Sequence, residues 1–119
     1  MNRPTALDRL VEFALSLPGT SEADHHGISS LRVREKIFAT VPDADHLRIM
    51  ASEPEILAAH DADPAAYGLF YWGRRLACVV VDTRRAEATR THELLVEAWE
   101  RKAPAALRRE LEARQHESG

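Results

Sequence analysis

The chain of 119 residues contains a single cysteine, Cys78, so an internal disulfide is excluded. This cysteine lies in the apolar run LACVVV, where we expect a buried and unreactive thiol. Glycine is also scarce: the five glycines are scattered, and none belongs to a glycine-rich loop of the kind that cradles phosphate. The sequence therefore excludes a disulfide scaffold and the common nucleotide-binding loops.

Long apolar runs are missing as well. No segment approaches the roughly 18 consecutive apolar residues that a membrane span requires. The N-terminal stretch MNRPTALDRL has the pattern of an amphipathic helix and not that of a signal peptide. We therefore expect a soluble, cytoplasmic protein that makes no membrane contact.

An excess of positive charge is absent too. The net charge is −3, which argues against a strong general affinity for nucleic acid. The charges are unevenly distributed, however. Residues 42–68 contain six acidic residues and one basic residue, Arg48, whereas residues 69–90 contain five arginines against Asp82 and Glu87. The second segment can therefore still supply contacts to phosphate.

Patterns typical of catalysis or metal binding are weak. No Ser, His and Asp set has the support of a known motif. His25 and His26 stand near Glu22 and Asp24, but adjacent residues of a strand point to opposite faces, so the two imidazoles cannot easily share one ion. The acidic group within residues 43–63 could hold a hard cation, although a solvated face explains it as well. We expect no metal, no cofactor and no enzymatic activity.

Two β-hairpins are the clearest features that the sequence does contain. In residues 31–41, LRVREKIFATV, apolar residues alternate with arginines and then resume after a charged turn. Residues 69–72 and 76–81 are two further runs with strong β propensity, separated by Gly-Arg-Arg. Weaker strands are predicted within residues 20–28 and 46–50. The hairpins therefore predict an antiparallel sheet with two basic tips.

Helical patterns flank these strands. The spacing predicts helices over residues 4–16, 52–60, 91–103 and 104–114. Ser52 and Glu55 have the spacing of a capping box, and Thr91 is suited to cap the long third helix. Pro104 should break or kink the last helical region.

The order of these elements predicts an α+β, two-layer sandwich. We expect an antiparallel sheet of about five or six strands, covered on one face by the first and last helices, with the short middle helix at an edge. Residues 1–114 should form one domain, and residues 115–119 should be a frayed C-terminal tail.

Four stretches resemble the MmcQ/YjbR family of small bacterial proteins. They are LSLPGTSE (15–22), LRVREKIFAT (31–40), WGRRLACVVVD (72–82) and ELLVEAWERKAPAALRREL (93–111). The resemblance implies a double-wing fold, related to the frataxin-like and secretion-chaperone-like sandwiches, and a DNA-binding function. Family members often carry glycine at the first hairpin tip, where this chain has Arg34 and Glu35. The resemblance implies no catalytic motif.

The candidate nucleic-acid-binding residues are the basic side chains of the two hairpins: Arg32, Arg34, Lys36, Arg74 and Arg75. Arginine can bind phosphate through two hydrogen bonds, and Tyr71 or Trp72 could stack on a base. The alternative is that charged tips only keep exposed turns soluble and discourage pairing at sheet edges.

Two functions follow from these observations. The first is a DNA-binding module that contacts phosphates through the hairpin tips. The second is a non-catalytic adaptor for a protein or a small ligand, which would use the uncovered face of the sheet or the aromatic set around residues 67–72. The sequence leaves open whether the protein is a monomer or a dimer.

Overall fold

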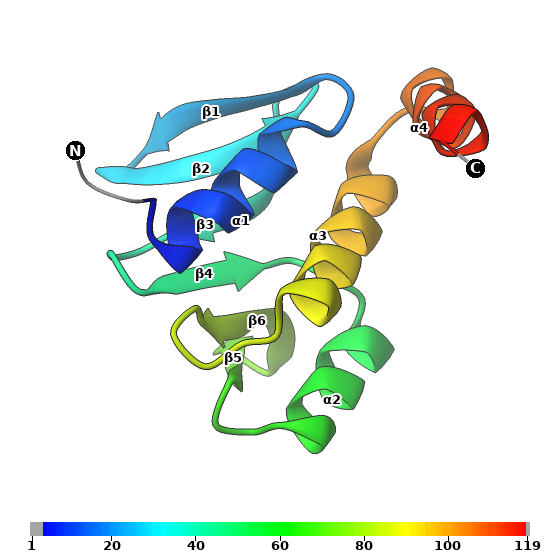
Figure 1. Ribbon diagram of the computed structural model, residues 1–119. Coiled ribbons are helices and arrows are strands. Elements are labelled where there is room, and N and C mark those ends of the chain that lie inside the picture. Colours follow the sequence, from blue (N-terminus) through cyan, green and yellow to red (C-terminus); the bar gives the residue numbers. More distant parts are fainter. Residues whose placement is uncertain (1–3, 119) are drawn as a thin grey trace.

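The fold is a single antiparallel sheet accompanied by helices. The structure is a computed structural model and describes residues 4–118. Its six strands form one sheet in the order β1-β2-β3-β4-β6-β5 (Figure 1), which confirms the predicted α+β class and the predicted number of strands. The elements are α1 (Ala6–Leu15), β1 (Thr20–His25), β2 (Ile28–Val33), β3 (Lys36–Val41), β4 (His46–Ile49), α2 (Glu53–Ala62), β5 (Tyr67–Trp72), β6 (Arg75–Asp82), α3 (Ala88–Lys102) and α4 (Ala105–Ser118).

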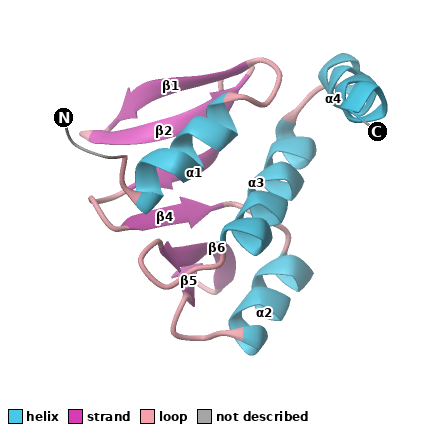
Figure 2. Cartoon of the chain, viewed as in Figure 1, coloured by secondary structure: helices cyan, strands magenta, loops and turns pink. Residues whose placement is uncertain are grey.

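The helices form the second layer of the sandwich. Helices α1 and α3 lie across one face of the sheet, where α1 contacts β1 and β2 and α3 contacts β3 and β4 (Figure 2). Helix α2 packs on β5 and β6. Helix α4 lies beyond the end of α1, where Arg114 donates a hydrogen bond to the carbonyl of Ser16 at 2.9 Å. It continues to Ser118, further than the sequence pattern predicted, and fraying of residues 115–119 stays a prediction.

The core lies between this helical layer and the sheet. In β4 and in the part of β6 that pairs with it, every second residue is fully buried (Leu47 and Ile49, Val79 and Val81), because side chains of a strand point to opposite faces in turn. Tyr67 and Trp99 are the largest buried side chains. Tyr67 hydrogen-bonds to Thr91 at 3.0 Å, and the indole N–H of Trp99 donates to the carbonyl of Pro18 at 3.0 Å. These bonds attach α3 to β5 and to the segment that leaves α1.

Two predicted helix caps are wrong. Ser52 precedes α2, but its side chain makes no capping hydrogen bond; instead its backbone N–H donates to the carboxylate of Glu97 on α3 at 2.8 Å. Helix α3 begins three residues before Thr91, at Ala88. Thr91 is buried in its first turn and donates its hydroxyl proton to the carbonyl of Glu87 at 2.8 Å. At Ser52 a contact with another helix replaces the local cap, and Thr91 is buried within the helix instead of preceding it.

Gly19 lies at a close approach between α4 and the segment after α1. Its φ is +67°, and an added Cβ would lie 2.6 Å from Cδ1 of Leu107. We therefore expect Gly19→Ala to lower the free energy of unfolding by about 2 kcal/mol, because both backbone strain and steric overlap oppose it. Urea denaturation measures the change.

Gly27→Ala is the matched control. The φ of Gly27 is +86°, but no atom lies within 4 Å of the added Cβ. Only backbone strain should therefore lower the free energy of unfolding of this variant, by about 1 kcal/mol. Equal losses in the two variants would contradict the proposed overlap with Leu107.

The register of the sheet assigns side chains to its two faces. Ile49 lies between Ala39 and Val79 in the ladder, and all three are buried under the helices. Arg48, one residue earlier, therefore points to the opposite face, which no helix covers within residues 4–118. We call this surface the open sheet face.

Candidate nucleic-acid interface

The two basic hairpins end on the same side of the molecule. Strands β3 and β6 are both antiparallel to β4, so they point the same way, and the turn before each lies at the same end of the sheet. Strand β3 begins at Lys36 and β6 begins at Arg75, and the first residues of both strands lie beyond the end of the shorter β4. Two hairpins therefore project from this end: wing 1, formed by β2 and β3, and wing 2, formed by β5 and β6. Their centres are separated by three strand spacings, or about 14 Å before twist.

The tip of wing 1 has an unusual backbone. Arg34 and Glu35 connect β2 to β3 with φ values of +51° and +68°. Two consecutive positive values are the pattern of a type I′ turn, which normally favours Asn and Gly. The tip of wing 2 contains Gly73, whose φ is +63°, followed by Arg74. Each tip therefore reverses the chain within two residues and presents an arginine at its end.

Four of the five candidate residues lie at these tips. Arg34, Lys36, Arg74 and Arg75 are exposed, and none of them takes part in an ion pair among the described residues. Glu35 adds one negative charge at the tip of wing 1. The four cations remain available to an anionic partner.

Arg32 does not belong to the tip, where the sequence analysis had placed it. It is a residue of β2, half-buried, and its guanidinium donates to the hydroxyl of Ser30 at 2.9 Å and to the carbonyl of Asp24 at 3.2 Å. Strand β2 extends to Val33, so the hairpin turns only at Arg34 and Glu35. Arg32 therefore lies along the open sheet face.

A third group of basic residues adjoins wing 2. Arg75, Arg101 and Lys102 line a hollow of about 250 Å³ together with Glu53. Arg101 also donates to the carbonyl of Met50 at 2.9 Å, which holds the end of α3 near the end of β4. The sequence alone gives no sign of this contribution, because only the crossing of α3 over the sheet brings residues 101–102 near residue 75.

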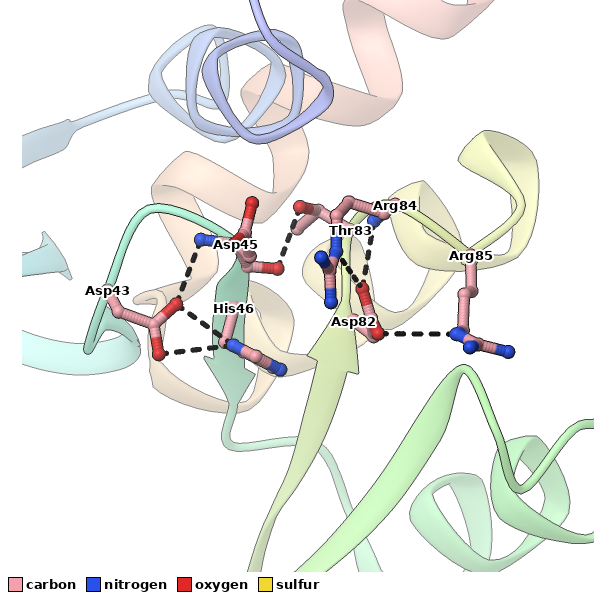
Figure 3. Close-up of polar contacts among 7 residues, drawn as sticks. All are labelled: Asp43, Asp45, His46, Asp82, Thr83, Arg84 and Arg85. Carbon is pink, nitrogen blue, oxygen red and sulfur yellow. Dashed lines mark hydrogen bonds and ion pairs between the residues drawn. The ribbon is translucent and has the colours of Figure 1, made fainter.

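The opposite end of the sheet is electrostatically different. Figure 3 shows that Arg84 and Arg85 both approach Asp82, at 3.4 and 3.5 Å. Partial burial opposes ionisation of Asp82, but the backbone N–H and the guanidinium of Arg84 outweigh it and lower the pKa of Asp82. These two arginines are thus compensated, whereas Arg74 and Arg75 are not. Four of the five arginines of residues 69–90 are therefore divided: Arg74 and Arg75 lie at the end with the wings, and Arg84 and Arg85 lie at the opposite end of the sheet.

The β3–β4 turn at this end forms its own polar cluster. Asp43 accepts a hydrogen bond from the backbone N–H of Asp45 at 2.8 Å and contacts the imidazole of His46 at 2.9 Å (Figure 3). The Asp45 bond and then the His46 bond lower the pKa of Asp43. Asp43 thus closes the β3–β4 turn and holds the imidazole of His46.

A hollow of about 440 Å³ lies between α1 and the start of α3. In it, the ring of His92 stacks on that of Phe13, with 3.9 Å between centroids and 7° between planes. Removal from solvent lowers the pKa of His92. Arg9 and Glu12 also line the hollow.

Acidification should therefore destabilise the fold in part through His92. Its pKa in the folded state lies below that in the unfolded chain, so the unfolded state binds the proton more readily and His92 contributes stability that is lost as the pH falls below about 6.5. We expect thermal unfolding of His92→Gln to depend less on pH between about 7 and 5 than that of the unaltered chain. His116→Gln, at an exposed position on α4, is the control. An unchanged pH dependence in His92→Gln would contradict this assignment.

Within residues 4–118 no group of three or more His, Cys, Asp or Glu side chains is arranged to hold a metal ion. His26 lies in a turn with φ +52° and not in the strand, so its ring contacts that of His25 edge to face, at 4.5 Å between centroids, contrary to the expected opposite orientation. None of the described helices has the length and apolar character needed to cross a bilayer.

The fold and the paired tips define a small α+β domain with two projecting basic hairpins. The chain belongs to the YjbR family: the family model matches residues 15–101, which confirms the resemblance to the MmcQ/YjbR proteins. No curated protein and no solved structure matches the chain significantly.

Proposed function

We propose that this protein is a non-catalytic DNA-binding module that contacts phosphates through its two wings. The observation that carries the proposal is the position of both basic tips at the same end of the sheet, on either side of the shorter β4. Membership of the YjbR family supports it as well.

The geometry suits a duplex. The separation of the wing centres, about 14 Å before twist, is comparable with the width of about 12 Å of the major groove of B-DNA. Each wing could then meet one of the two phosphate backbones that border a groove. Arg34 and Arg74, at the two turns, would make the outermost contacts.

The charge distribution limits the expected affinity and specificity. The net charge is −3, and Glu35 adds a carboxylate at one tip, so we expect modest affinity. Among the described residues, no ion pair fixes the orientation of a basic side chain of the tips toward a base edge. Contacts of this kind position a protein on DNA but do not read its sequence.

The test is the binding of a labelled random-sequence duplex by fluorescence polarisation, at salt concentrations from about 50 to 200 mM. We expect a dissociation constant in the micromolar range at the lowest salt, and a steep loss of affinity as salt increases, because phosphate contacts release counterions. No binding at about 50 mM salt would overturn the proposal.

An adaptor function is the second candidate, because Tyr71 and Trp72 leave 53% and 72% of their surfaces exposed. Exposed aromatic side chains are frequent at the centres of protein interfaces. The absence of duplex binding even at the lowest salt concentration would favour this candidate over the wings.

A further inference from the structure

The open sheet face contains a hollow of about 190 Å³ that reaches from β1 and β2 to wing 2. Its lining includes two cations, Arg48 and Arg75, and two aromatic rings, Phe70 and Trp72, but no carboxylate. Drug-sized ligands usually occupy about 300 to 1,000 Å³, so this hollow suits one small planar group with a negative charge nearby.

Arg48 is the unusual residue of this hollow. Its guanidinium lies 4.6 Å from the centroid of the Phe70 ring, and its Nε is buried without a hydrogen-bond partner. It forms no ion pair with any described side chain. A buried donor that loses water without gaining a partner is unfavourable, and an anionic ligand would supply that partner.

Besides Arg48 and Arg75, the hollow is lined by His25 and by uncharged side chains. Cys78 lies opposite Phe70 in the ladder, and burial raises the pKa of its thiol although the charge of Arg48 acts in the other direction. Thr40 lies opposite Arg48 on β3. No acidic group of the hollow competes with a ligand for Arg48.

Trp72 supplies an exposed planar surface beside this cation. It pairs with Arg75 across wing 2, so an aromatic ring and a cation stand together at the end of the face. Its neighbour Tyr71 pairs with Leu76 and so points to the other face of the wing. Exposed aromatic rings flanked by arginines are the arrangement on which proteins stack unpaired bases.

We propose that the open sheet face binds an unpaired nucleotide, whose base stacks on Trp72 and whose phosphate pairs with Arg48 and Arg75. This differs from the duplex contacts of the wing tips, and it rests on the proposed function only in the choice of nucleic acid as the partner. The ligand is a flexible single strand, because a base paired within a duplex does not expose its ring for stacking.

The two tryptophans make the proposal directly measurable. Trp99 is fully buried, whereas Trp72 is exposed, so an added oligonucleotide can quench only Trp72 by stacking. The probe is a single strand of about ten thymidines, within the range of site sizes known for such surfaces. We expect saturable quenching of the exposed tryptophan, whereas emission that stays unchanged both with this strand and with an oligouridine of equal length would overturn the proposal. An oligouridine of equal length tests RNA: quenching by either strand supports the site and identifies the preferred sugar.

Variants locate the site. Trp72→Leu should weaken binding of the labelled strand about tenfold or more, as loss of one stacked base does, and Arg48→Gln should weaken it several-fold. Tyr71→Leu is the matched control, since it removes an exposed aromatic from the other face of the same strand. Equal losses in Tyr71→Leu and Trp72→Leu would overturn the assignment to the open sheet face.

The wing-tip proposal is tested separately. Removing Arg34 and Arg74 should markedly weaken duplex binding but leave quenching of Trp72 by the single strand largely intact.

Discussion

Replacing Arg34, Lys36, Arg74 and Arg75 together by alanine is expected to lower affinity for a DNA duplex about a hundredfold at about 50 mM salt. Each lost phosphate contact should also reduce the slope of log affinity against log salt by about 0.9. The four side chains are exposed and form no ion pair with any described residue, so their removal should leave the fold unchanged. Fluorescence polarisation over a salt series measures both quantities, and circular dichroism checks the fold.

A matched pair of double variants separates position from net charge. Arg34→Ala/Arg74→Ala removes two positive charges from the wing tips. Arg84→Ala/Arg85→Ala removes the same number from the opposite end of the sheet, where both arginines already face Asp82. We expect a marked loss of affinity in the first variant and little change in the second. Similar losses in both would show that net charge, and not the wings, controls binding.

Trp99→Ala is expected to have the largest effect on stability, a loss of about 3 to 5 kcal/mol in the free energy of unfolding. Trp99 is completely buried, and its indole N–H donates to the carbonyl of Pro18. The substitution would therefore create a cavity under α3 and leave a buried carbonyl without its partner. Urea denaturation followed by circular dichroism measures the loss.

Trp72→Ala is the natural comparison. Trp72 leaves 72% of its surface exposed, so the same substitution should change the free energy of unfolding by no more than about 0.5 kcal/mol. Comparable destabilisation by the two substitutions would contradict the burial described for Trp99. A neutral Trp72→Ala would mean that this large aromatic contributes little to the fold, which is the property expected of a binding residue.

The sequence predicted those parts of the fold that depend on local patterns. Alternation in residues 31–41 identified the first hairpin, and the Pro18-Gly19 pair identified the end of the first helix. The caps at Ser52 and Thr91 were predicted wrongly. Glu97 reaches the backbone of Ser52 from another helix, and Thr91 is buried beside Tyr67. Neither contact leaves a signal within a short window of sequence.

The candidate site likewise contains residues that local sequence could locate and residues that it could not. Basic residues at turns could be recognised from composition, so four of the five candidates lie at the tips. Arg32 was misplaced because the end of β2 could not be fixed to within two residues. Arg48 was counted only as the single basic residue of an acidic segment. Its position between Leu47 and Ile49 in a strand was the available signal, since alternation places it on the face opposite the core.

The backbone at the tip of wing 1 has a cost in local stability. Arg34 and Glu35 both occupy the left-handed region, where a residue with a side chain is disfavoured by about 1 to 2 kcal/mol relative to glycine. An Asn-Gly pair would form the same reversal more readily. It would also leave that turn without a charged side chain. The chain thus gives up local stability at the one place in wing 1 where a long cationic side chain extends furthest from the body of the protein.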